Sequence, residues 1–434
     1  MSKIIEYRDE RIGEKYYKIA HESGISVFVF PKDRQSSCAI LSTEFGSLNN
    51  VIIEKNGKTL QLPNGIAHFM EHKMFDNENG ENVDDVFSSL GADPNAYTSW
   101  DHTAYFFTCT SGEAFYECIE NLVDFVKKPY FTERSVDKER GIIEQEIAMC
   151  EDDPYDRCFY GMMKGLYKKH PVRIEVIGSK ASISQITPEL LYKCHELFYS
   201  SSNMTLVICG EVDVDRIVKL IDKKFFQETN SQDIKRICYQ EPRRVHQKLV
   251  ECKMAVERPI FSIGFKDFAA CEDLMKTRRR QLVADILLGI VFASSNELYV
   301  SLFKKGIMTT PFNYGADYGK DYAFCYANGE CDDPYLLFEK IKKHISYLKR
   351  KGINRDDFER RKKILYSSDI KMYDSTWDIA NAILDSASYG TDIFSELKMI
   401  ESITLEETQE LLNELFVTEK MTCSIVNPVL RKEK

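Results

Sequence analysis

The chain has 434 residues, 43% of them apolar and 29% charged, and its 58 basic and 68 acidic side chains give a net charge of −10. Ordinary counts of 21 Gly and 12 Pro exclude collagen-like, low-complexity and disordered classes, and the acidic balance argues against a nucleic-acid binder. No stretch approaches the roughly 20 apolar residues that span a bilayer, so we expect no transmembrane segment.

The first half predicts a mixed succession of strands and helices. Alternating apolar residues indicate strands at 24–32 and 37–47, which together read as an opening hairpin or meander. A helix is expected after Pro63-Asn64-Gly65 and carries the sequence IAHFMEHKMF. Further strands are expected at 95–110 and 203–210, with helices at 113–128, at 132–151 and after residue 213.

The second half repeats this order. The segment KMTCSIVNPVL at 420–430 echoes NMTLVICGEVD at 203–213, a separation of 217 residues. So long a period indicates two similar halves and excludes a solenoid of short repeats. We predict an α+β fold with two similar halves, each a mixed β-sheet with helices mainly on one face. The polar stretch 227–236 is the predicted linker, and it separates domains 1–230 and 231–434.

The cysteines and the N-terminal sequence bear on the cellular compartment of the protein. The 13 cysteines are odd in number, scattered and without a C-x-x-C pair. The charged N-terminus lacks the apolar core of a signal peptide. We therefore expect reduced, mostly buried thiols and a cytoplasmic location.

Two of the eight histidines stand in HFMEH, at His68 and His72. On a helix this i,i+4 spacing places both imidazoles on one face, where they can bind one ion. Glu71 projects near the same ion without needing to bind it. The pattern H-x-x-E-H is the inverted zincin signature, and imidazole pairs suit zinc. The alternative is a helix with two ordinary histidines and a surface glutamate.

A third zinc ligand should be a His, a Cys or a carboxylate, and the predicted helix at 132–151 offers several acids. At about 100° per residue, three apolar residues lie on the side of Glu146: Ile142, Ile143 and Met149. Glu139 shares this face, so both acids interrupt an apolar stripe. A buried carboxylate needs a partner, which makes Glu146 the candidate ligand and Glu139 the candidate that orients a histidine. The alternative is a charged helix whose acids all reach water.

These motifs resemble the insulinase/pitrilysin metallopeptidases, which carry H-x-x-E-H and a distal glutamate in an ER-x-x-x-x-x-E-I segment. Here Glu146 lies 74 residues after His72, with Glu139-Arg140 and Glu146-Ile147 in the matching positions. Further matches are the segments 95–105, 170–179 and 199–210. The resemblance is specific over most of residues 20–225 and extends to the second half only in general layout. The chain resembles the half-length bacterial processing-peptidase subunits, and HFMEHKMF resembles most the bacterial zinc proteases associated with peptide or bacteriocin maturation.

The resemblance implies a set of roles that the chemistry of these residues supports. One Zn²⁺ per chain would be bound by His68, His72 and Glu146. Glu71 would be the catalytic general base on the attacking water and would pass a proton to the leaving amine. An extended peptide would pair with the backbone of a substrate-binding edge strand at Asn95, Ala96, Tyr97 and Thr98. The alternative for this last segment is an ordinary buried strand.

The second half departs from the family pattern. It has no H-x-x-E-H, so 1–230 is the expected catalytic zinc-binding domain and 231–434 a homologous non-catalytic domain. The family uses an Arg followed shortly by a Tyr to hold the peptide carbonyl. The matching stretch 301–315 has Lys304 and Lys305 where Arg is expected and Met308-Thr309-Thr310 where Tyr is expected. Lys is a poor substitute for a bidentate Arg.

Three functions fit the sequence. The first is a zinc endopeptidase acting on short or unfolded peptides, with peptide or bacteriocin precursor processing as a candidate role. It would work as a heterodimer with a related subunit that supplies the Arg/Tyr pair, a homodimer being the alternative. The second is a catalytically silent peptide-binding or scaffolding subunit of the same fold, and the third an unrelated metal-stabilised protein. Manganese or cobalt could replace zinc in the same site.

Overall fold

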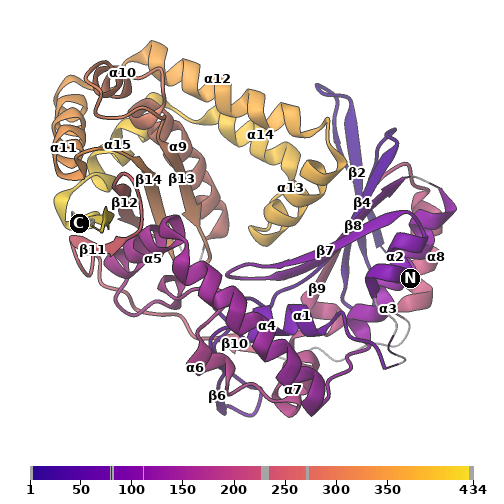
Figure 1. Cartoon of the computed structure of the whole chain (residues 1–434). Helices are drawn as coiled ribbons and strands as arrows, with labels where there is room; N and C mark the ends of the chain where they lie inside the picture. The colour runs from indigo at the N-terminus through magenta and orange to yellow at the C-terminus, as the bar shows by residue number, and fades with distance from the viewer. Residues whose placement is uncertain are drawn as a thin grey trace. The chain divides into compact units, whose positions relative to one another are not determined.

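The computed structural model describes residues 3–78, 80, 83–110, 112–225, 234–269 and 273–429 (Figure 1). They form two compact units that interleave along the chain. Unit 1 comprises 1–147, 175–237 and 371–394, and unit 2 comprises 148–174, 238–370 and 395–434. Each unit therefore contains a segment from the other half of the sequence.

The predicted linker falls mostly outside the described residues. Residues 227–233 are not among them, and neither is the predicted domain boundary between 230 and 231, which stays a prediction. The end of the predicted linker, Lys235–Arg236, is a short strand, β10, that pairs with β5 (Val51–Ile53). The third member of this small sheet is β6 (Thr59–Gln61).

Unit 1 is built on a mixed seven-stranded sheet. In spatial order its strands are β1 (Lys3–Asp9), β2 (Glu14–Ala20), β3 (Ser26–Pro31), β9 (Met204–Gly210), β4 (Ser36–Thr43), β8 (Thr103–Thr110) and β7 (Ala92–Thr98). The predicted hairpin of β3 and β4 is wrong, because β9 lies between them, parallel to β3 and antiparallel to β4. β7 and β8 do form a hairpin, and β7 is the edge strand.

The side chains of β8 point alternately to the two faces of the sheet, and their contacts show which helices cover each face. Tyr105 and Phe107 contact aromatic rings of α3 (Glu113–Lys127), whereas Phe106 contacts Trp377 of α13 (Thr376–Ser388). Helices α3 and α13 therefore pack on opposite faces (Figure 1). The face of α3 also carries α1 (Ile66–Lys73), and Phe75, two residues after the end of α1, contacts Tyr105. The other helices of this unit are α2 (Val83–Ser89), α6 (Lys180–Ile183), α7 (Pro188–Phe198) and α8 (Val214–Lys224).

Unit 2 has a five-stranded mixed sheet. In spatial order its strands are β11 (Leu249–Met254), β15 (Met421–Pro428), β12 (Ile260–Asp267), β14 (Ala323–Glu330) and β13 (Asn313–Tyr318). β15 is parallel to β11 and antiparallel to β12, as β9 is to β3 and β4 in unit 1. The echo between 203–213 and 420–430 thus marks the same position in two sheets, which confirms the predicted fold of two similar halves.

The helices of unit 2 also cover both faces of its sheet. Odd-numbered residues of β12 join the core of α9 (Leu274–Phe292) and α15 (Leu405–Leu415), and Gly264 contacts α5 (Pro154–Leu166). The remaining helices are α10 (Glu297–Lys304), α11 (Pro334–Lys351), α12 (Arg355–Met372) and α14 (Ile393–Ser402). α12 and α14 cross a boundary between the units, as does α4 (Glu133–Asp152).

One apolar segment of unit 2 meets the length and composition of a membrane span. It is Leu274–Lys304, and 61% of its most apolar window is buried inside the structure. Burial of this kind is typical of the core helix of a globular unit. The segment is also divided into α9 and α10 around Ala293–Asn296.

A buried acid fixes the loop after α5 to the sheet of unit 2. Glu241 accepts backbone N–H groups from Lys168, Lys169 and His170 at 2.6, 2.8 and 2.9 Å. It also lies 3.1 Å from Nζ of Lys266, whose side chain is 1% exposed. Burial alone raises a carboxyl pKa, but these three hydrogen bonds and the Lys266 charge lower the pKa of Glu241.

The described cysteines carry free thiols, and nine of these twelve are buried. This agrees with the predicted reduced and mostly buried state. Cys271 lies outside the described residues.

Candidate active site

The H-x-x-E-H motif lies on α1, on the side opposite its buried stripe. Ile66, Phe69, Met70 and Lys73 face the core. His68 and His72 project together from the other side, with ring centroids 4.7 Å apart. The predicted i,i+4 pair is therefore present on one helical face.

Two close-packed glycines hold the N-terminus of α1. Gly65 has a φ of +89°, and a Cβ there would lie 2.3 Å from the carbonyl oxygen of Ile177. Gly178, with a φ of +81°, would place a Cβ 2.4 Å from the oxygen of Asn64. Only glycine tolerates both the conformation and the approach. Ile177 and Gly178 thus pack directly against the start of the helix that carries the histidines.

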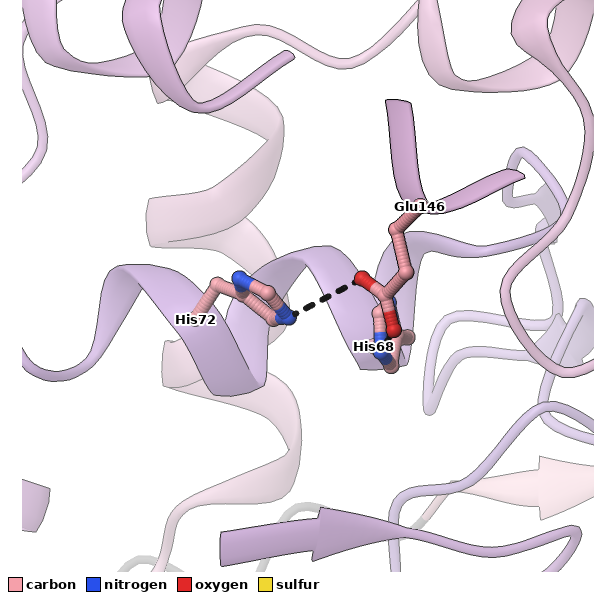
Figure 2. Close-up of side chains that lie close together, drawn as sticks. All are labelled: His68, His72 and Glu146. Carbon is pink, nitrogen blue, oxygen red and sulfur yellow. Dashed lines mark ion pairs between the residues drawn. The ribbon is translucent and has the colours of Figure 1, made fainter. Parts of the chain in front are cut away.

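Glu146 of α4 meets both histidines (Figure 2). Its Oε1 lies 3.6 Å from Nε2 of His68, and its Oε2 lies 3.6 Å from Nε2 of His72. One donor atom from each of the three residues lies within 4.8 Å of the others. Among the described residues, this is the one group of three or more His, Cys, Asp or Glu side chains with such spacing.

The three donors fit a zinc ion. Ligand atoms about 2.0–2.1 Å from a tetrahedral Zn²⁺ are about 3.4 Å from one another, and the Glu146 oxygens lie 3.6 Å from the two imidazole nitrogens. Two imidazoles and one carboxylate also match the donor set of catalytic zinc, which keeps a fourth position open. Burial and the charge of His72 lower the pKa of His68 to about 4, so its lone pair is available at neutral pH.

Glu139 contacts one of the histidines. Its Oε1 lies 3.0 Å from Nδ1 of His72, which leaves Nε2 of that ring directed at Glu146. Burial alone would raise the pKa of Glu139, but the hydrogen bond and charge of His72 lower it. The pKa of His72 is raised: burial lowers it, and the Glu139 hydrogen bond and nearby carboxylates outweigh that effect.

The apolar-stripe interpretation of α4 is wrong in part. The buried residues of this helix are Val136, Ile143 and Ile147. Ile142 and Met149 are 45% and 72% exposed, so they do not share a buried face with Glu146. The side chain of Glu146 is 39% exposed and borders the buried stripe. Helical angle alone did not distinguish the border of the stripe from its centre.

Glu71 stands apart from the three-residue group. Its Oε2 accepts a hydrogen bond of 2.6 Å from the Thr98 hydroxyl, and burial raises the pKa of the Glu71 carboxyl. Thr98 is the last residue of β7, so the edge strand and the motif helix meet at this contact.

The predicted substrate-binding residues all lie on β7 (Asn95, Ala96, Tyr97 and Thr98). No strand pairs with its outer edge in the part of the chain that the structure describes. Tyr97 points to the face of α13, where its hydroxyl lies 3.5 Å from Oδ1 of Asn381 and 3.3 Å from Nε2 of His102. Thr98 points to the opposite face, toward Glu71.

Sequence reasoning missed two features near the site. Lys73 follows His72 directly, yet its side chain is 1% exposed and pairs with Asp76. The i, i+3, i+4, i+7 stripe from Ile66 to Lys73 was the available signal. Asn381 and Trp377 come from α13, more than 260 residues beyond β7 and β8, and no local pattern linked them to these strands.

The stretch 301–315, which lacks the Arg and Tyr expected from the family, lies in unit 2. Lys304 ends α10, and both Lys304 and Lys305 are exposed. Met308 is buried, and Thr309 accepts a hydrogen bond of 2.9 Å from Arg258. Tyr314 lies on β13 and packs against the core of this unit.

Comparison with known proteins gives consistent matches. The family description "Insulinase (Peptidase family M16)" matches residues 60–180, and "Peptidase M16 inactive domain" matches 185–365. The uncharacterized zinc protease YmfH of Bacillus subtilis (strain 168) is 37% identical over 98% of this chain and 99% of its own length. An uncharacterized zinc protease of Rickettsia felis is 24% identical over 84% of this chain and 88% of its own length.

Solved structures share the fold. An M16-like peptidase from Alicyclobacillus acidocaldarius has a TM-score of 0.89 at 27% identity, covering 99% of each chain. Pitrilysin has a TM-score of 0.77 at 17% identity, and the match covers 100% of this chain and 47% of pitrilysin.

Proposed function

The chain belongs to the M16 (insulinase) family of peptidases, and on this premise we propose that it is a zinc-dependent endopeptidase of short or unfolded peptides. The observation that carries the proposal is the convergence of His68, His72 and Glu146, with Glu71 on the same helix as the two histidines but outside this group of three. A purely structural zinc site would close its fourth position with another protein ligand.

His68, His72 and Glu146 would hold one zinc ion per chain, with manganese or cobalt as alternative metals. An ion held by these residues would supply Lewis acidity, which would make a water molecule a better nucleophile at neutral pH and would polarise the peptide carbonyl. Glu139 would keep Nδ1 of His72 protonated and its Nε2 directed at the ion.

Glu71 would move the protons of the reaction. Its carboxylate accepts a proton from the attacking water and delivers it to the nitrogen of the leaving amine. The desolvation that raises the pKa of Glu71 makes it a stronger base than a solvated glutamate.

The edge strand β7 would bind the substrate. An extended peptide adds to its backbone at Asn95, Ala96, Tyr97 and Thr98, using main-chain hydrogen bonds with little demand on sequence. Only an extended segment can add as a strand, which favours short or unfolded peptides over folded proteins. Processing of peptide or bacteriocin precursors in the cytoplasm is the role that we propose.

A related subunit would complete the site. The stretch 301–315 has no Arg followed by a Tyr at the family positions, and Lys304 and Lys305 cannot reproduce a bidentate guanidinium. We therefore expect a heterodimer in which the partner supplies this pair. A homodimer would lack it in both copies.

A reconstitution assay tests the proposal. The purified chain is assayed alone and with a related chain that lacks H-x-x-E-H, using quenched fluorescent peptides and measuring bound metal. We expect about one zinc per chain in both samples, and hydrolysis at least about tenfold faster with the partner, because the added Arg stabilises the developing oxyanion. Full activity of the chain alone would refute the heterodimer. Bound zinc without hydrolysis in either sample would favour the scaffolding alternative.

Replacement of Glu139 tests the orienting role. Glu139→Ala should weaken zinc binding by about 10- to 100-fold, because His72 loses the group that fixes its tautomer and ring orientation. Chelator competition measures the affinity. Glu144→Ala, on the same helix and without a contact to either histidine, is the matched control. Equal affinities in the two variants would show that Glu139 does not orient His72.

A further inference from the structure

The hydroxyl of Thr98 contacts the proposed base directly. Oγ1 of Thr98 lies 2.6 Å from Oε2 of Glu71. This is within the range of about 2.5–2.7 Å typical of a hydroxyl bonded to a carboxylate, and such charge-assisted bonds are roughly twice as strong as neutral ones.

The two groups themselves fix the direction of this bond, because a carboxylate oxygen accepts and the Thr98 hydroxyl donates. Thr103 faces Thr98 across the hairpin, with the two hydroxyl oxygens 3.4 Å apart. The hydrogen of Thr103 is donated to the carbonyl oxygen of Phe45 at 2.7 Å. Thr103 therefore has no hydrogen left to donate to Thr98, and the Thr98 hydrogen goes to the carboxylate at 2.6 Å rather than to the Thr103 oxygen 3.4 Å away.

The hairpin tip that carries Thr98 is held by its neighbours. The N–H of Ser99 bonds to the oxygen of His102 at 2.8 Å and closes the turn. The N–H of Leu48 bonds to the oxygen of Trp100 at 2.8 Å. At Gly46 a Cβ would lie 2.5 Å from the same Trp100 oxygen, so the two loops are in close backbone contact. A β-branched side chain on such a fixed backbone has little rotational freedom.

The contact with Thr98 makes the two carboxylate oxygens of Glu71 different from each other. Oε2 is occupied by Thr98, whereas Oε1 has no hydrogen-bond partner among the described residues. We propose that Thr98 is a positioning residue that holds Glu71 in one orientation, so that Oε1 is the oxygen that exchanges protons with water and the leaving amine. This inference rests on the proposed function and assigns Thr98 a side-chain role beyond its backbone contact with substrate.

Three variants separate this role from packing of the strand. Thr98→Val keeps the shape and the backbone and removes the hydroxyl. Thr98→Ser restores the hydroxyl without the methyl group. Thr108→Val makes the same change on β8 of this hairpin, at a residue that makes no contact with Glu71, and is the matched control.

With the peptidase in its active assembly, Thr98→Val should lower kcat about 10- to 100-fold and leave KM and zinc content unchanged. Thr98→Ser should recover most of kcat, and Thr108→Val should match the wild type. Equal losses in Thr98→Val and Thr98→Ser, or a rise in KM alone, would overturn the proposal, because packing or substrate binding would then explain the effect.

Crystal structures of the same variants give a readout that does not need activity. The Glu71 carboxylate should have one orientation in the wild type and in Thr98→Ser, with Oε2 against residue 98, and more than one in Thr98→Val. One unchanged orientation in Thr98→Val would overturn the inference even if the chain proves to be a peptidase. An ordered Glu71 that becomes disordered in Thr98→Val would support it even if no peptide is cleaved and the proposed function fails.

Discussion

Glu71→Gln should lower peptide hydrolysis by about 10²- to 10⁴-fold while zinc stays bound. Glutamine has the same shape, and its amide oxygen can accept the Thr98 hydrogen bond, but the amide cannot take a proton from water. The three proposed ligands are untouched, so the metal content should remain that of the wild type. Peptide cleavage and metal analysis on one preparation measure both effects.

Glu144→Gln is the control for this experiment, since it changes one acid of α4 that contacts neither histidine. It should be indistinguishable from the wild type. Loss of zinc in Glu71→Gln to the same degree as loss of hydrolysis would instead assign Glu71 to the structure of the site. Unchanged hydrolysis would remove Glu71 from the mechanism.

Glu241→Gln should lower the free energy of unfolding of unit 2 by about 3–5 kcal/mol, because it leaves the buried ammonium of Lys266 without its counter-charge. Burial lowers the pKa of Lys266. Without Glu241 the buried ammonium can release its proton, which removes part of the free-energy cost of the unpaired charge. Urea unfolding followed by circular dichroism measures the difference. Glu339→Gln, which breaks the exposed pair with Lys342, should cost less than about 1 kcal/mol.

The destabilisation should depend on pH with a definite sign. The pKa of Glu241 is lower in the folded protein than in the unfolded chain. Its contribution is therefore complete above the unfolded value and is lost as the pH falls through the folded value. The difference in free energy of unfolding between wild type and Glu241→Gln should be largest near about pH 7 and should decrease in the acid range. A gap that widens on acidification would contradict this assignment.

Individual helices and strands were predictable because each one's sequence pattern lies within its own residues. The stripe and breaker residues around α1 located the motif helix, strand-type residues at 95–110 included β8, a compact β run ending in glycine located β9, and its echo at 420–430 located β15. The insertion of β9 between β3 and β4 was not predictable, because pairing of strands distant in sequence leaves no periodicity in either strand. For the same reason, the exchange of α5 and α13 between the units has no local signal.

The candidate site was predictable to the level of residue types and spacing. His68 and His72 follow from helical geometry, but Glu146 required the family spacing as well, since the exposed Ile142 and Met149 misled the stripe argument. The bond between Thr98 and Glu71 joins a hairpin tip to a helix 27 residues earlier. Such a contact depends on how two elements pack, which the sequence of neither element encodes.

The exchanged helices determine the order in which the chain can complete its fold. α13 covers Phe106 on unit 1, yet it is synthesised after four of the five strands of unit 2. α5 packs on the sheet of unit 2, but it leaves the ribosome before any of those strands. Unit 1 therefore lacks one of its helices until most of the strands of unit 2 have been synthesised. Scission within residues 227–233 would therefore separate each sheet from a helix that packs on it.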